Sequence, residues 1–238
     1  MYLRAIHAEG SIKALFEFIK QSPLGILTTA IPSDSHPFIQ SSHIPWVLDE
    51  ISDDPDAPVK GKLRGHMARQ NPQAKVIMEN AGQSASQLTQ DFYTETKPST
   101  AKVVPTWNYS AVQVYGKATI YYDSASPETS SYLSQQIHDL SQLCETSQMG
   151  YTGQEGKPEP WTVSEAPERY IDIMKKNIIG IEIAIESIGG KFKMSQESSQ
   201  GDREGVINGF SSLGSDVGDQ MANLIKERCA MKDASKTQ

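Results

Sequence analysis

The sequence predicts an α+β fold: a mostly antiparallel β-barrel of about six or more strands with peripheral helices. Three observations support this class. Alternation of apolar and polar residues with a period of two dominates residues 24–68 and 107–122. Helical stretches interrupt the strands instead of alternating strictly with them, which disfavours a doubly wound parallel sheet. Neither a GxGxxG fingerprint nor a Walker A sequence occurs, so a Rossmann or P-loop nucleotide site is also disfavoured.

The first third of the chain predicts one helix followed by strands. Apolar residues at helical spacing indicate a short amphipathic helix over residues 12–19. Strands are expected over 24–29, over the alternating set between 38 and 48, and over 61–68. The acidic, proline-containing run 52–61 has no periodicity, which is typical of a hairpin-type loop.

The middle of the chain contains the clearest strand signal. Residues 107–122 carry five apolar or aromatic side chains of one parity, and Gly116 within them marks a possible bulge. Residues 75–80 are expected to form another strand. The polar segment 81–102 supports no assignment.

The remaining third predicts four helices and one strand. Ser126 and Pro127 fit the first positions of a helix that ends near residue 149. Isoleucines of one parity predict a strand with one wet face over 177–195. The other expected helices span 164–176, 202–210 and 215–228.

Composition excludes several classes of protein. The 238 residues include 22 Lys and Arg against 29 Asp and Glu, a formal charge of -7, so no global positive field attracts nucleic acid. Cys144 and Cys229 stand far apart and outside any metal-ligand spacing, so neither a disulfide framework nor a metal site is expected. No secretion signal and no run of about 20 apolar residues is present, and we therefore expect a cytoplasmic protein.

Basic side chains gather on the strand predicted at 61–68. Lys62, Arg64 and His66 share one parity and hence one face, and Arg69 follows in a turn with Asn71. Such a cluster could hold a phosphate, because Arg donates bidentate hydrogen bonds and turn N–H groups add further donors. A solvated basic strand face is the alternative interpretation.

Two further polar sets have a functional and a structural interpretation. Trp107 and Tyr109 flank Asn108 and could stack on a planar ring and bind its edge, or they could simply be core residues at the start of a strand. Lys191 and Lys193, followed by Ser195 and Gln196, could complete an anion or ring-edge site. Equally, lysines on an edge strand protect against aggregation.

These segments resemble the PaiB family in order and spacing over roughly residues 1–210. The resemblance rests on Ser-His-Ile-Pro at 42–45, Gly-Lys-Leu-Arg-Gly-His-Met-Ala-Arg-Gln-Asn-Pro at 61–72, Val-Pro-Thr-Trp-Asn-Tyr at 104–109, Gly-Ile-Glu-Ile at 180–183 and Gly-Lys-Phe-Lys-Met-Ser-Gln at 190–196.

The resemblance implies an FMN-binding split β-barrel, a homodimer with flavin sites at the subunit interface, and a role as a negative regulator like the bacterial members. It implies a split-barrel domain over 1–210, with inserted helices 127–149 and 164–176, and a C-terminal helix and tail over 211–238. It places His66, Arg69 and Asn71 near the FMN phosphate and ribityl chain, Trp107, Asn108 and Tyr109 near the ring or the paired subunit, and Lys193, Ser195 and Gln196 where they close the site. The FMN contacts expected on this basis also include Arg64 and Met67. No catalytic residue is implied.

The chain departs from the family within residues 79–99, where it lacks the family's Gly-Pro-containing aromatic stretch, and this departure bears on which ligand is bound and whether flavin is retained. One alternative is an FMN-dependent oxidoreductase or flavin reductase on the same fold. Another is a split-barrel interaction scaffold without flavin. No helix-turn-helix with a basic recognition helix is evident, which disfavours direct nucleic-acid binding.

Overall fold

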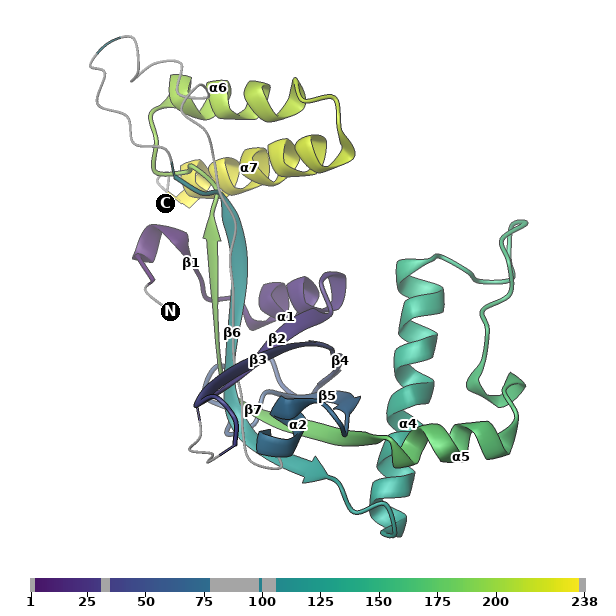
Figure 1. The fold of residues 1–238 in the computed structure, drawn as a ribbon. Coiled ribbons are helices and arrows are strands. Elements are labelled where there is room, and N and C mark those ends of the chain that lie inside the picture. The colour runs from purple at the N-terminus through teal and green to yellow at the C-terminus, as the bar shows by residue number, and fades with distance from the viewer. Residues whose placement is uncertain (1–2, 31–34, 78–98, 100–105, 236–238) are drawn as a thin grey trace. The chain divides into compact units, whose positions relative to one another are not determined.

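The computed structural model (Figure 1) describes residues 3–30, 35–77, 99 and 106–235. They fall into two compact units. Unit 1 takes its residues from Met1–Ser11, Ala85–Gln113 and Ile188–Gln238, and unit 2 from Ile12–Ser84 and Val114–Ser187. Each unit is described by itself.

Unit 2 is organised around strand β5 (Gly61–Ala68). β5 pairs antiparallel with β4 (Val47–Glu50) on one side and with β7 (Ile178–Lys193) on the other, and β6 (Tyr109–Tyr121) also pairs with β7. Burial alternates along β5: Leu63 and Met67 point into the core, whereas Arg64 and His66 occupy the opposite face.

A second, two-stranded sheet pairs β2 (Leu24–Ala30) with β3 (Ile39–Pro45). Trp46 follows β3 and is buried against two glycines: a Cβ on Gly25 would lie 2.8 Å from its indole, and one on Gly65 would lie 2.9 Å from it. Only glycine therefore leaves room for this side chain. Helix α1 (Ile12–Gln21) adds Leu15 and Phe16 to the core.

Helix α4 (Pro127–Gln142) begins as predicted, because the Ser126 hydroxyl accepts a hydrogen bond from the Thr129 N–H at 3.4 Å. A π-helical turn, η3 (Leu143–Gln148), continues it. The 3-10 turn η4 (Val163–Glu165) and helix α5 (Glu168–Lys176) follow, and the Trp161 N–H before them donates to Glu145 Oε2 at 3.1 Å.

The strand predicted at 75–80 is wrong for the residues that the structure describes there, because Pro72–Ile77 form helix α2. Asn71 caps this helix by accepting the Gln73 N–H at 2.8 Å, and Pro72 takes its first position. Residues 78–80 and nearly all of 81–102 lie outside the described residues. The alternating set at 38–48 forms two strands, β3 and β4, which part at Trp46.

Unit 1 contains a short N-terminal segment and two helices. The turn η1 (Ala5–His7) leads into β1 (Ala8–Glu9), where Ala8 lies opposite Lys191. Helices α6 (Gln200–Ser211) and α7 (Asp216–Ser235) confirm the two closing helices. Their shared core contains Met194, Val206, Ile225 and Cys229.

The predicted α+β class with mostly antiparallel strands and peripheral helices is confirmed. The domain division at residue 210 stays a prediction. Among the described residues, no helix is both long and apolar enough to cross a bilayer.

Candidate functional site

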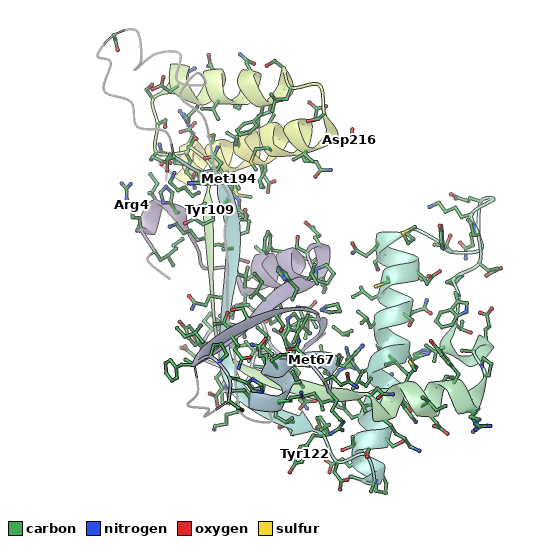
Figure 2. All side chains as sticks on the ribbon, viewed as in Figure 1. Arg4, Met67, Tyr109, Tyr122, Met194 and Asp216 are labelled. Carbon is green, nitrogen blue, oxygen red and sulfur yellow. The ribbon has the colours of Figure 1, made fainter. Side chains whose placement is uncertain are left out.

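The predicted flavin contacts belong to two separate sets. Unit 2 holds Arg64, His66, Met67, Arg69 and Asn71, and the remaining six fall in unit 1. Figure 2 shows the side chains of both units, including Met67 in unit 2 and Tyr109 in unit 1. The structure brings residues together within each set.

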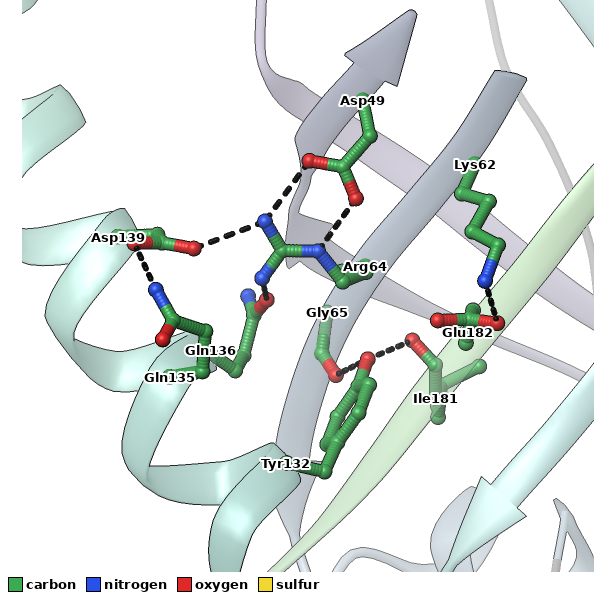
Figure 3. A network of polar contacts seen from close by, with 10 residues as sticks. All are labelled: Asp49, Lys62, Arg64, Gly65, Tyr132, Gln135, Gln136, Asp139, Ile181 and Glu182. Atoms are coloured by element: carbon green, nitrogen blue, oxygen red, sulfur yellow. Dashed lines mark hydrogen bonds and ion pairs between the residues drawn. The ribbon is translucent and has the colours of Figure 1, made fainter. Parts of the chain in front are cut away.

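Arg64 is bound by carboxylates of its own chain (Figure 3). Its Nε donates to Asp49 Oδ2 at 2.6 Å, and its Nη2 donates to Asp49 Oδ1 at 2.9 Å and to Asp139 Oδ2 at 2.8 Å. The Asp49 hydrogen bonds and the Asp139 carboxylate raise the pKa of Arg64. Lys62 on the same face lies 2.9 Å from Glu182 Oε1. A phosphate would have to compete with these carboxylates for both cations.

Tyr132 of α4 contacts strand β7. Its hydroxyl donates to the Ile181 carbonyl at 2.6 Å, and its ring stacks on Tyr121 with centroids 3.9 Å apart. Burial raises the pKa of the phenol. A Cβ on Gly180 would lie 2.3 Å from this ring, so glycine provides the space for it. Tyr132 and the Arg64 contacts together attach α4 to β5 and β7.

His66 and Met67 point to opposite faces of β5. Burial lowers the pKa of His66, and its Nδ1 is buried with no hydrogen-bond partner among the described residues. Met67 is 6% exposed and belongs to the core. Of these two side chains, His66 is therefore the one that has a buried polar atom without a hydrogen bond among the described residues.

Arg69 and Asn71 follow β5 and hold neighbouring segments. The Arg69 guanidinium donates to the Tyr122 carbonyl through Nη2 and to the Lys176 carbonyl through Nε at 3.3 Å. Asn71 donates from Nδ2 to Ser42 Oγ at 2.9 Å while its Oδ1 caps α2. In this arrangement Asn71 uses both ends of its amide, whereas Arg69 binds no carboxylate among its described contacts.

In unit 1 the start of β6 meets the end of β7. Lys193 Nζ donates to Thr106 Oγ1 at 3.0 Å and to the Trp107 carbonyl at 2.9 Å. Ser195 Oγ donates to Asn108 Oδ1 at 3.0 Å. Asn108 is 3% exposed, and its Nδ2 has no hydrogen-bond partner among the described residues. A buried amide donor therefore lies one residue after the Trp107 carbonyl that Lys193 binds.

The aromatic neighbours of Asn108 differ in exposure. Trp107 is 40% exposed, and Tyr109 is partly buried with Lys191 Nζ 5.1 Å from its ring centroid. This distance places the ammonium within cation–π range of the ring. Trp107 thus presents an open aromatic face in this unit.

Gln196 holds the turn after β7. Its Oε1 accepts the Met194 N–H at 2.6 Å, and its Nε2 donates to the Ile6 carbonyl at 3.3 Å. Ser195 just before it has a φ of 56°, in the left-handed region that costs a non-glycine residue about 1 kcal/mol. The turn therefore keeps Ser195 in the position from which it reaches Asn108.

Charges around Lys193 are mostly positive. Burial lowers the pKa of Lys193, Glu197 opposes that shift, and Lys191 and Arg4 add to it. Glu197 Oε1 lies 3.9 Å from Lys193 Nζ, and Glu197 Oε2 lies 3.2 Å from Nε2 of the buried His7. One carboxylate is thus shared between two basic side chains.

The sequence interpretation missed the partners that decide these roles: Asp49, Asp139, Tyr132, Glu197 and His7. Asp139 and Gln136 lie three residues apart on α4, a spacing that puts both on one helix face, and Gln136 Oε1 accepts from Arg64 Nη1 at 3.4 Å. That spacing was a usable signal for a polar contact. Nothing in the sequence linked it to β5.

FMN contains a phosphate, hydroxyl groups and ring heteroatoms, and the described residues offer groups that fit them. In unit 1 these groups are the buried Asn108 Nδ2, which has no hydrogen-bond partner among the described residues, the Lys193 ammonium and the exposed Trp107 ring. In unit 2, taken by itself, they are the buried His66 Nδ1 and the Arg69 guanidinium, which binds backbone carbonyls. When bound, FMN would supply hydride and electron transfer chemistry.

Comparisons with known proteins show what the chain is similar to. An uncharacterized protein of Aspergillus fumigatus is 53% identical over 261 residues, covering 98% of this chain and 99% of that protein. “Protease synthase and sporulation protein PAI 2” of Bacillus subtilis is 22% identical, covering 96% of this chain and 98% of that protein. The solved structure of an FAD and heme binding protein from Mycobacterium smegmatis aligns with a TM-score of 0.41 at 12% identity, over 79% of this chain and 73% of that chain.

The family model described as “Putative FMN-binding domain” matches residues 1–187. This match covers more than half of the chain and supports FMN as its flavin cofactor. The chain therefore belongs to this FMN-binding family.

Proposed function

We propose that this chain is a cytoplasmic, homodimeric FMN-binding protein with a regulatory role, and that its flavin sites lie at the subunit interface. The observation that carries flavin binding is the buried Asn108 Nδ2, which has no hydrogen-bond partner among the described residues and follows the Trp107 carbonyl that the Lys193 ammonium binds. A buried donor without a partner costs about 1–3 kcal/mol, so a ligand that accepts its hydrogen bond is favoured.

The regulatory part rests on likeness to the Bacillus subtilis protein, whose name refers to protease synthesis and sporulation. With a formal charge of -7, regulation through protein or ligand contacts is favoured over reading of DNA. FMN would then act as the bound signal.

Titration of the purified protein with FMN, followed by flavin fluorescence and absorbance, tests the cofactor. We expect saturable binding with one FMN per chain. Absence of binding even at a large excess of FMN would reject the proposal and favour a flavin-free scaffold.

Light scattering with and without FMN tests the assembly, for which we expect a dimer. Promoter fragments titrated at physiological salt should show no sequence-dependent binding. Bleaching of the bound flavin by reduced nicotinamide, followed by reoxidation with an acceptor, would contradict a purely regulatory role and indicate an oxidoreductase.

A further inference from the structure

Two places in the chain carry the basic residues that an FMN phosphate requires. The first is the β5 face in unit 2, where Arg64 and Lys62 already bind three carboxylates of their own unit. Displacing those carboxylates would leave them unpaired and partly buried, which opposes binding of an anion there.

The second place is the end of β7 in unit 1, where the charge balance is reversed. Lys193 lies near Lys191 and Arg4, and the carboxylate beside it among the described residues, that of Glu197, also lies 3.2 Å from His7 Nε2. The side chain of Lys193 is 15% exposed, so water screens this positive charge only partly. An anion at this point would relieve the repulsion among the three cations.

Two donors at this place are left without a hydrogen-bond partner among the described residues. An ammonium has three donors, and the described contacts of Lys193 to neutral oxygens use two of them. Asn108 Nδ2 supplies the other donor, and Ser195 fixes the amide by donating to its Oδ1. A charged and a neutral donor on adjoining segments are the elements of a phosphate site.

We propose that Lys193 and Asn108 bind the phosphate group of FMN, with Ser195 as a positioning residue that orients the Asn108 amide. The proposal rests on the FMN binding proposed above and assigns the phosphate to unit 1 instead of to the basic face of β5.

Comparison of FMN with riboflavin, which lacks the phosphate, tests the assignment in the full-length protein. We expect the wild type to prefer FMN. Lys193→Met and Asn108→Asp should each lower that preference by about tenfold to a hundredfold and leave riboflavin affinity within about twofold, because riboflavin has no phosphate for the lost donors to bind. Retained riboflavin binding also shows that each variant is folded.

Lys62→Met is the matched control, since it removes one lysine charge from the β5 face, and the FMN preference should be unchanged. Lys193→Arg should restore most of the preference, since the charge is kept. For Ser195→Gly, which keeps the turn but loses the hydroxyl, we expect an intermediate loss.

The outcomes separate the two proposals. A wild type that binds neither flavin rejects the proposed function and this site with it. A wild type that binds both flavins equally keeps flavin binding and overturns the phosphate site. Loss of the FMN preference in Arg69→Gln, with Lys193→Met unaffected, would move the phosphate to the turn after β5.

Discussion

The guanidinium of Arg64 and the carboxylate of Asp139 lie 2.8 Å apart (Nη2 to Oδ2), although 75 positions separate them in the sequence. Asp49 binds the same guanidinium from β4, so one arginine joins a helix and two strands. The side chain of Arg64 is 12% exposed, which makes this an interior contact instead of a surface ion pair.

Arg64→Met should therefore destabilise the protein. Both aspartates would lose their shared cation, and we expect the free energy of unfolding to fall by about 2 kcal/mol, less than for a fully buried pair because Asp49 is 40% exposed. Urea unfolding measures it. The control is Lys117→Met, whose lysine is 86% exposed and pairs with Glu186, and it should change stability by less than about 0.5 kcal/mol. An unchanged urea midpoint in Arg64→Met would contradict the role assigned to this contact.

Gly180→Ala should destabilise the attachment of α4. The new Cβ would lie 2.3 Å from the Tyr132 ring, and moving the ring disturbs its stacking on Tyr121. Overpacking of this kind costs about 1–3 kcal/mol. The measurement is a double-mutant cycle with Tyr132→Leu, in which Gly180→Ala should cost much less once the ring is gone. Equal costs in both backgrounds would argue against this steric conflict.

His66 should make stability depend on pH. Burial lowers its pKa in the folded state, so the unfolded chain takes up the proton first as the pH falls. Stability from this group is complete above the unfolded pKa of about 6.5 and is lost as the pH falls below it. His66→Asn should lose less stability than the wild type between about pH 7.5 and pH 5.5 in urea titrations. The exposed His138 provides the control, His138→Asn. Parallel pH profiles for His66→Asn and the wild type would be inconsistent with a buried neutral imidazole.

Lys193 should make the FMN preference depend on pH. Burial, together with Lys191 and Arg4, lowers its pKa against the opposing effect of Glu197, so its positive charge is lost at a lower pH than that of an exposed lysine. We expect the ratio of FMN to riboflavin affinity to fall as the pH rises from about 7 towards the usual lysine pKa of about 10.4. Lys193→Arg keeps its charge throughout that range and should show a flatter profile. Identical slopes for the two proteins would assign the pH dependence to another group.

Local patterns predicted most elements and none of the decisive contacts. Strand β5 occupies the predicted 61–68, because strict alternation over eight residues is a strong signal. Helix α2 was missed because Val76 and Ile77 read as a strand, whereas the Asn71 cap and Pro72 start a helix. A local cap thus outweighed a short apolar run.

In the candidate site, too, local patterns identified residues but not the distant partners that bind them. Sequence spacing identified Arg64 as a cation on a strand face but could not show that Asp139 of α4 would bind it. The resemblance expected the sets at 107–109 and 193–196 around one flavin, which stays a prediction, and in the structure Lys193 binds the Trp107 carbonyl and Ser195 binds Asn108. Charge neutralisation depends on residues far apart in the chain, and periodicity carries no information about it.

Trp46, enclosed by Gly25 and Gly65, also gives the molecule an internal spectroscopic reporter. The chain has three tryptophans, and the other two, Trp107 and Trp161, are 40% and 43% exposed. Indole emission shifts to the blue in an apolar environment, so with both exposed tryptophans replaced by phenylalanine the remaining emission follows the core of unit 2 alone. Keeping Trp107 instead places the reporter next to Asn108 in unit 1. The two units can then be followed independently as they unfold or take up flavin.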